Sequence, residues 1–176
     1  MGLFGKKKLT EIEAAACFVL MVTKGVQQQW PQIVKELKGI IQAEDAISND
    51  QYASFEFVLA VIAFQIQALP NLLSADQASR IREYVMQCIS APELGDYPRE
   101  ALKEYQSAWD QSLQNGEPPF FGIASVLFDK LGCRSFVELG EAKFKSPLLL
   151  SALSEKVVMF GGPWWKTVTR QYKLVP

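Results

Sequence analysis

FEFVLAVIAFQIQAL, residues Phe55–Leu69, is the stretch that decides the fold of this chain. Its apolar residues occupy every side of a helical wheel, and only Glu56, Gln65 and Gln67 interrupt them. A helix that is apolar all round is normally covered by neighbouring helices. Roughly fifteen residues make a rod of about 22 Å, shorter than the roughly 30 Å hydrocarbon core of a bilayer. We therefore expect a central helix at about 49–69, buried within a soluble helical domain.

The chain is long enough to form one domain with a substantial core. It has 176 residues, of which 49% are hydrophobic and 21% are charged, and both values are typical of globular proteins. The segment 91–98 contains two prolines and a glycine and is expected to be a loop. It divides the helical region 9–162 into two possible halves, 9–90 and 99–162. We expect both halves to share one core, between a basic extension at 1–8 and a tail at 163–176.

Capping residues and apolar stripes place the other helices. Thr10 and Glu13 have the spacing of a capping box at the start of the first helix, which Gly25 is expected to end. Pro31 suits the first turn of a second helix. Residues 133–145 fit either a loop or a short interrupted helix. The prediction is an all-α, single-domain array of about seven helices, at about 9–24, from 31 onward, and at 49–69, 75–90, 99–115, 120–131 and 146–160.

The C-terminal segment differs in kind from the helices. From Lys166 to Val175 it is rich in β-branched residues that alternate with polar ones, a pattern typical of extended chain. We therefore predict an extended arm over residues 163–176. No other segment resembles a partner strand, so the arm could lie over its own helices, pair with the sheet edge of a partner, or fray.

Charge is distributed unevenly along the chain. The net charge is −1, from 18 basic and 19 acidic residues. Six of the basic residues lie at the two ends, as Lys6, Lys7, Lys8, Lys166, Arg170 and Lys173. The other 12 basic residues and all 19 acidic ones give the rest of the chain a net charge of −7. The net charge of −1 predicts no general affinity for nucleic acid, and the distribution describes an acidic body with two basic ends.

The composition removes most kinds of catalytic site. The chain has no histidine, which excludes a Ser-His-Asp triad, a Cys-His pair and a haem held by a proximal histidine. The three cysteines, Cys17, Cys88 and Cys133, form no CxxC pair, and we expect Cys17 and Cys88 to be reduced and buried. No glycine-rich phosphate loop is present. We therefore expect no cofactor or metal, lean against an enzyme, and expect a cytoplasmic location.

The three polar residues of the central stretch are candidates for ligand binding. Burial in an apolar helix would raise the pKa of Glu56, although this residue also lies near the helix start, where an acid is favoured by the dipole. Gln65 and Gln67 point about 200° apart, so at least one should bond to a neighbouring helix. Alternatively, Glu56, Gln65 and Gln67 could line a small-molecule pocket between the central helix and residues 120–128.

The two chain ends are candidates for contact with other molecules. Tryptophan, tyrosine and arginine dominate binding hot spots, so the arm is a candidate partner-binding surface, although its tryptophans could equally cover the helical core. Its candidate residues are Trp164, Trp165, Arg170, Tyr172 and Lys173. The N-terminus could fray or make weak contact with an anionic membrane through Leu3, Phe4, Lys6, Lys7 and Lys8. The sequence thus favours a non-enzymatic module for protein–protein interaction or self-association, with small-molecule binding as the alternative.

Overall fold

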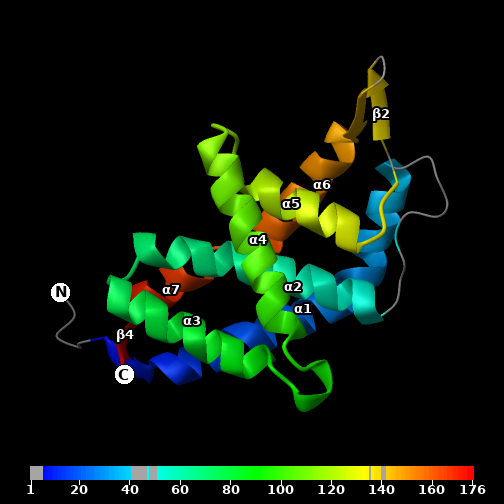
Figure 1. Cartoon of the computed structure of the whole chain (residues 1–176). Coiled ribbons are helices and arrows are strands. Elements are labelled where there is room, and N and C mark those ends of the chain that lie inside the picture. Colours follow the sequence, from blue (N-terminus) through cyan, green and yellow to red (C-terminus); the bar gives the residue numbers. More distant parts are fainter. Residues whose placement is uncertain (1–5, 41–46, 48–50, 135, 140–141) are drawn as a thin grey trace.

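The computed structural model describes residues 6–40, 47, 51–134, 136–139 and 142–176 (Figure 1). Over these residues the protein is mainly helical, as predicted, with seven α-helices, two 3-10 helices and four short strands. The elements in chain order are β1 (Lys7–Thr10), α1 (Glu11–Ile40), α2 (Gln51–Ala68), η1 (Leu69–Asn71), α3 (Ala75–Ile89), η2 (Pro92–Leu94), α4 (Tyr97–Gln114), α5 (Pro119–Lys130), β2 (Phe136–Leu139), β3 (Ala142–Lys145), α6 (Pro147–Gly161), α7 (Trp164–Gln171) and β4 (Tyr172–Val175).

Helix α2 is the central buried helix that its apolar sequence predicts. Every residue from Phe57 to Ala63 is buried, and α1, α4, α5 and α6 all pack against the helix (Figure 1). With η1 it forms a segment of 21 residues, Gln51–Asn71, that is long and apolar enough to cross a membrane. However, 72% of that apolar window is buried inside the protein by its own helices. Such burial is what the core helix of a globular domain shows.

The prediction of two separate helices, one ended by Gly25 and the next begun at Pro31, is wrong, because the structure has the single helix α1 there. It runs without a break for 30 residues and contains both. Phe18, Val22 and Val26 are buried at four-residue spacing, and the buried stripe continues to Leu37. A proline inside a helix costs roughly 3 kcal/mol because it removes a backbone hydrogen bond. Burial of a long apolar stripe against the core offsets that cost.

Two polar contacts join the start of α1 to its surroundings. The predicted capping box is present, because the Glu13 carboxylate accepts hydrogen bonds from the backbone and side chain of Thr10. The buried Glu11 carboxylate accepts two hydrogen bonds from Arg80 of α3, at 2.7 and 2.8 Å. These bonds hold the pKa of Glu11 below its ordinary value. They fix the relative position of α1 and α3 by a charged pair of defined geometry.

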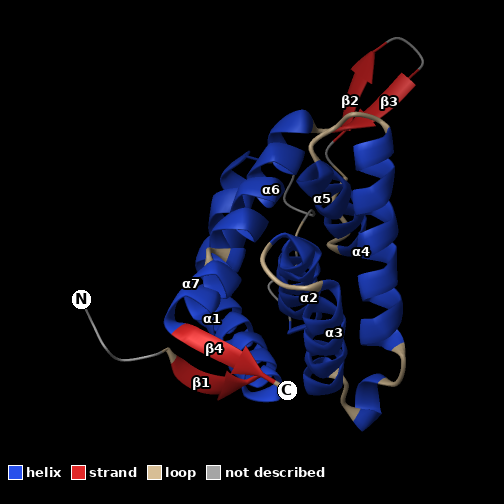
Figure 2. Cartoon of the chain, turned by 90° about the vertical axis from the view of Figure 1, so that its left-hand side faces the viewer, coloured by secondary structure: helices blue, strands red, loops and turns tan. Residues whose placement is uncertain are grey.

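The tail is not extended over the whole predicted range. Residues 164–171 form helix α7, in which Trp165 and Val168, three positions apart, are buried. Only Tyr172–Val175 is extended, and this strand, β4, pairs in parallel with β1 (Figure 2). The sequence does not indicate the partner strand, because Lys7–Thr10 is short and begins with charged residues. Its register places Lys8 opposite Lys173 and Leu9 opposite Leu174.

The ambiguous segment after α5 contains an antiparallel hairpin of β2 and β3. It projects from the helical body at the end opposite to β1 and β4 (Figure 2). Lys145 anchors its base, because its ammonium group donates hydrogen bonds to the backbone oxygen and hydroxyl of Ser125 and contacts Asp129. Val137 and Phe144 are paired across the strands and are 41% and 50% exposed. The hairpin is thus tied to α5 at one end and open to solvent beyond it.

The expectation that Cys17 and Cys88 are buried is wrong, because both residues are exposed. Cys133 is the buried one, and burial raises the pKa of its thiol to about 12. At neutral pH this thiol therefore stays protonated and packs as a small apolar group.

Helices α4 and α5 cross so closely at Gly122 that a side chain cannot fit. A Cβ atom at this position would lie 2.2 Å from the backbone oxygen of Ala108. We expect Gly122→Ala to lower the free energy of unfolding by about 1–3 kcal/mol, because the two helix backbones must separate. Urea denaturation checks this against Gly39→Ala, which meets no atom within 4 Å and should be neutral or slightly stabilising. Equal stability of the two variants would contradict the close crossing.

Candidate functional site

The two basic ends of the chain meet on one surface. Pairing of β1 with β4 places Lys8 directly opposite Lys173, and the ammonium group of Lys6 donates a hydrogen bond of 2.6 Å to the backbone oxygen of Thr169. Figure 2 shows both strands at the end of α7, on the outside of the helical body. We name this the basic surface; its members are all exposed and comprise Lys6, Lys7, Lys8, Lys166, Arg170 and Lys173.

The two faces of the β1–β4 pair have different partners. Lys7, Leu9, Tyr172 and Leu174 share one face by strand alternation. On this face Leu174 is buried, Leu9 and Tyr172 are half-buried, and Lys7 is exposed at the start of the strand. Lys8 and Lys173 share the opposite, exposed face. Like charges directly opposite each other destabilise a strand pair, so this arrangement costs the fold energy. The apolar inner face therefore holds the strands in place while the outer face presents positive charge.

No acid of the described chain pairs with the basic surface. The ion pairs among the described residues use other bases, namely Arg80, Arg99, Lys130, Lys145 and Lys156. Of the acids that follow β1, Glu11 is bound to Arg80 and Glu13 to Thr10. The basic surface therefore keeps its charge open to an external anion, against a remainder of the chain that carries −7.

The aromatic members of the predicted arm face inward. Trp165 is 1% exposed, and its ring centroid lies 5.1 Å from that of Phe18 in α1. Trp164 is partly buried, also beside Phe18, and Tyr172 is half-buried. The predicted partner-binding residues therefore lie in two different environments. The two tryptophans pack against the core, and Arg170 and Lys173 lie on the surface. Leu3 and Phe4, predicted to contact a membrane, lie outside the described residues.

Glu56 lies in a buried cluster of hydroxyl groups. Its side chain is completely buried in α2, and Oε1 accepts a hydrogen bond from the hydroxyl of Tyr97. The hydroxyls of Tyr97 and Tyr52 are 2.9 Å apart, and the Tyr105 hydroxyl donates to the Glu56 backbone oxygen at 3.5 Å. Oε2 is buried without a hydrogen-bond partner among the described residues. Burial raises the pKa of the Glu56 carboxyl, and the positive charge of Lys130 opposes the rise.

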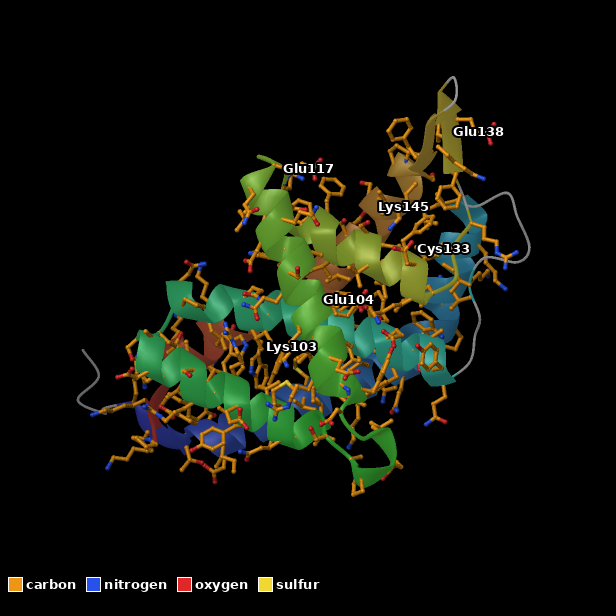
Figure 3. All side chains as sticks on the ribbon, viewed as in Figure 1. Lys103, Glu104, Glu117, Cys133, Glu138 and Lys145 are labelled. Atoms are coloured by element: carbon orange, nitrogen blue, oxygen red, sulfur yellow. The ribbon has the colours of Figure 1, made fainter. Side chains whose placement is uncertain are left out.

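Lys130 closes this cluster from α5. Its ammonium group lies 2.9 Å from the Glu104 carboxylate and 5.5 Å from the centre of the Tyr97 ring. Figure 3 shows Glu104 on α4, where that helix crosses α2. The cluster therefore draws on three helices, and the i, i+4 spacing of Tyr52 and Glu56 on α2 does not indicate the partners from α4 and α5. The cluster shields the Glu56 carboxyl from solvent, and its contacts bind α4 and α5 to α2.

Of the two glutamines, at least one of which is expected to bond to a neighbouring helix, Gln65 bonds to the end of α6. Its side-chain nitrogen donates a hydrogen bond of 3.2 Å to the backbone oxygen of Gly162, just after α6. Gly161 leaves the room for this contact, because a Cβ there would lie 2.5 Å from the same nitrogen. Gln67 is half-buried, and its side-chain nitrogen has no partner among the described residues. Gln65 therefore joins α2 to the end of α6.

Two of the grooves on the described surface are formed by three elements each and lie away from these glutamines. One of about 580 Å³ lies between α4, α5 and α6, with Ser112, Phe121 and Leu150 among its lining residues. The other, of about 460 Å³, lies between α1, α2 and η2. Neither is lined by Glu56, Gln65 or Gln67. At the predicted location beside α5, Ile123, Ala124, Leu127 and Phe128 are all completely buried.

A serine and a lysine lie together at the edge of the larger groove. Ser125 lines it, and the Lys145 ammonium group is 2.8 Å from the Ser125 hydroxyl (Figure 3). The Lys145 ammonium is also 2.5 Å from the Asp129 carboxylate. Lys145 therefore joins the base of the hairpin to α5.

No family model matches this chain, and comparison with the curated proteins and with the solved structures returns no significant similarity.

The buried carboxyl of Glu56 should make stability depend on pH. Because its pKa is raised in the folded state, the folded protein retains a proton that the unfolded chain releases above its ordinary pKa of 4.5. The carboxyl therefore lowers the free energy of unfolding as the pH rises from 4.5 toward the folded pKa. We expect Glu56→Gln, which cannot ionise, to become more stable relative to the natural chain between pH 4 and pH 8. Urea denaturation at several pH values measures this; a constant or shrinking difference would contradict it.

The inward position of Trp165 can be tested against its exposed neighbour. Trp165→Ala should lower the free energy of unfolding by about 3–5 kcal/mol, because it leaves a large cavity beside Phe18. Lys166→Ala, at an exposed position of the same helix, should change it by under about 0.5 kcal/mol. Thermal and urea denaturation provide the comparison. Similar stabilities would mean that α7 does not belong to the core.

Proposed function

We propose that this protein is a non-enzymatic helical interaction module that binds an acidic segment of another protein through its basic surface. The observation that carries the proposal is the meeting of two basic segments from opposite ends of the chain, with Lys8 and Lys173 side by side. The fold retains this repulsive pair, although an acid at either position would remove the repulsion. An external anion relieves the same repulsion.

The geometry favours contact through side chains over addition of a strand. β1 and β4 are four residues each, and lysines on an exposed edge discourage pairing with a further strand. Arg170 and Lys166 extend the charge from the strands onto α7. Guanidinium and ammonium groups bind carboxylates by charge-assisted hydrogen bonds. An acidic, flexible segment of a partner protein can meet several of these groups at once.

The charge distribution also affects how the partner arrives. An acidic body with one basic end orients the molecule in the field of an anionic partner and accelerates association. Exposed charge pairs contribute little individually and are screened by salt. We therefore expect moderate affinity that decreases strongly between low and physiological ionic strength. Self-association and weak membrane contact use the same charges and are distinguished by experiment; a cytoplasmic location suits such a module.

Removal of the whole arm cannot test this proposal, because Trp165 belongs to the core. The test is a triple charge reversal, Lys8→Glu, Arg170→Glu and Lys173→Glu, at exposed positions. The matched control is Lys24→Glu, Lys35→Glu and Lys38→Glu, which alters the net charge equally on the exposed side of α1. Both should keep the circular dichroism spectrum and melting temperature of the natural chain within a few degrees.

Binding is measured by fluorescence anisotropy with a labelled twenty-residue peptide of alternating glutamate and serine. We expect the basic-surface variant to lose at least about tenfold in affinity and the control to lose under about threefold, because only the first removes the contacts. The basic-surface variant should also capture less of the proteins that the natural chain binds from a lysate, and the control should capture them nearly as well as the natural chain. Equal losses in the two variants would overturn the proposal. The proposal would also be overturned if the protein bound phosphatidylserine vesicles but not the peptide. The same holds if sedimentation showed that the basic surface is needed for self-association alone.

A further inference from the structure

The smaller of the two surface grooves has the composition of a ligand site and is separate from the basic surface. It has a volume of about 460 Å³, within the usual range for small-molecule sites. Three elements form it: the middle of α1, the first two turns of α2, and η2. At this groove α2 is no longer enclosed by its neighbours. Gln51 and Tyr52, in its first turn, are exposed to solvent.

The walls of the groove are aromatic and apolar. Tyr52, Phe55 and Val58 follow one another at three-residue spacing, which places them along one face of α2. Leu94 of η2 also lines the groove. Tyr52 is 54% exposed, although it belongs to the first turn of the core helix α2. Its hydroxyl lies 2.9 Å from that of Tyr97, so the ring is held in place from behind.

Among the described lining residues, the polar ones carry negative charge and no positive charge. Glu93 of η2 is exposed and is the charged residue among the described lining residues. The remaining polar groups are uncharged and include acceptor oxygens, on Thr23, Gln27, Gln51 and Ser54. Aromatic ring faces and a carboxylate both attract cations, and both repel anions. The groove therefore complements a molecule with a positive head and an apolar body.

We propose that this groove binds a small organic ammonium ion. The ammonium head lies between the Glu93 carboxylate and the face of the Tyr52 or Phe55 ring, where ion pairing and cation–π attraction act together. The apolar body of the ligand rests against Val58 and Leu94. Gln27 and Gln51 accept hydrogen bonds from the remaining ammonium protons. The site gives the protein a ligand-binding activity that does not depend on the basic surface.

The probe for this site is phenethylammonium, compared with 2-phenylethanol and phenylacetate, which share its ring but are neutral and negative. Each is titrated to 10 mM into isotope-labelled protein, and backbone amide shifts are followed by NMR. We expect saturable shifts with phenethylammonium, centred on residues 51–58 and 92–94 and on the α1 residues of the groove. Phenylethanol should bind at least about fivefold more weakly, and phenylacetate should give no saturable shifts.

Three variants distinguish recognition of the cation from loss of structure. Glu93→Gln removes the charge at an exposed position and should weaken phenethylammonium binding at least about fivefold, with little effect on phenylethanol. Phe55→Leu should weaken both while circular dichroism reports a folded protein. Glu117→Gln, at the edge of the larger groove, is the matched control and should have no effect. The proposal is overturned by the absence of binding at 10 mM, by equal affinity for the neutral probe, or by shifts centred elsewhere.

Discussion

Burial of α2 on all sides is the constraint on which the rest of the structure depends. A helix that is apolar all round loses stability wherever a side chain meets water, so it must be enclosed. Four helices, α1, α4, α5 and α6, supply that enclosure. Their arrangement also explains why Glu56 is tolerated: Tyr97 and Tyr105, both on α4, bring hydroxyl groups to a position that would otherwise have only apolar neighbours.

The same enclosure brings the chain ends together. α1 and α6 both cover α2 and pack against each other, and an ion pair between Glu36 and Lys156 joins them. β1 precedes α1 directly, and α7 with β4 follows α6 after a short turn. Once α1 and α6 lie side by side, two segments more than 150 residues apart in sequence become neighbours. The basic surface is therefore a consequence of covering the central helix, with Trp165 and Leu174 as its apolar attachment.

Several features could be predicted from local sequence because local physics decides them. The all-round apolar pattern of α2 and the capping box of Thr10 and Glu13 each depend on residues within a few positions of one another. Two wrong predictions, an extended tail and a break in α1, have a common cause: tertiary packing outweighs local preference. The tail was predicted as extended because Thr167, Val168 and Thr169 favour strands locally, yet contact of Trp165 and Val168 with the body decides for a helix. In α1, packing likewise outweighs the local effect of Pro31.

The sequence by itself determined an all-helical fold around one enclosed helix, the excess of basic residues at both ends, and the absence of histidine chemistry. These follow from composition and from periodicities of a few residues, which any part of the chain carries with it. Only the tertiary structure decided that the basic ends join, that the tryptophans face inward, and that the Glu56 cluster and the groove beside Tyr52 exist. Each of these needs side chains from two or three elements, and their meeting is a property of packing that no single segment encodes.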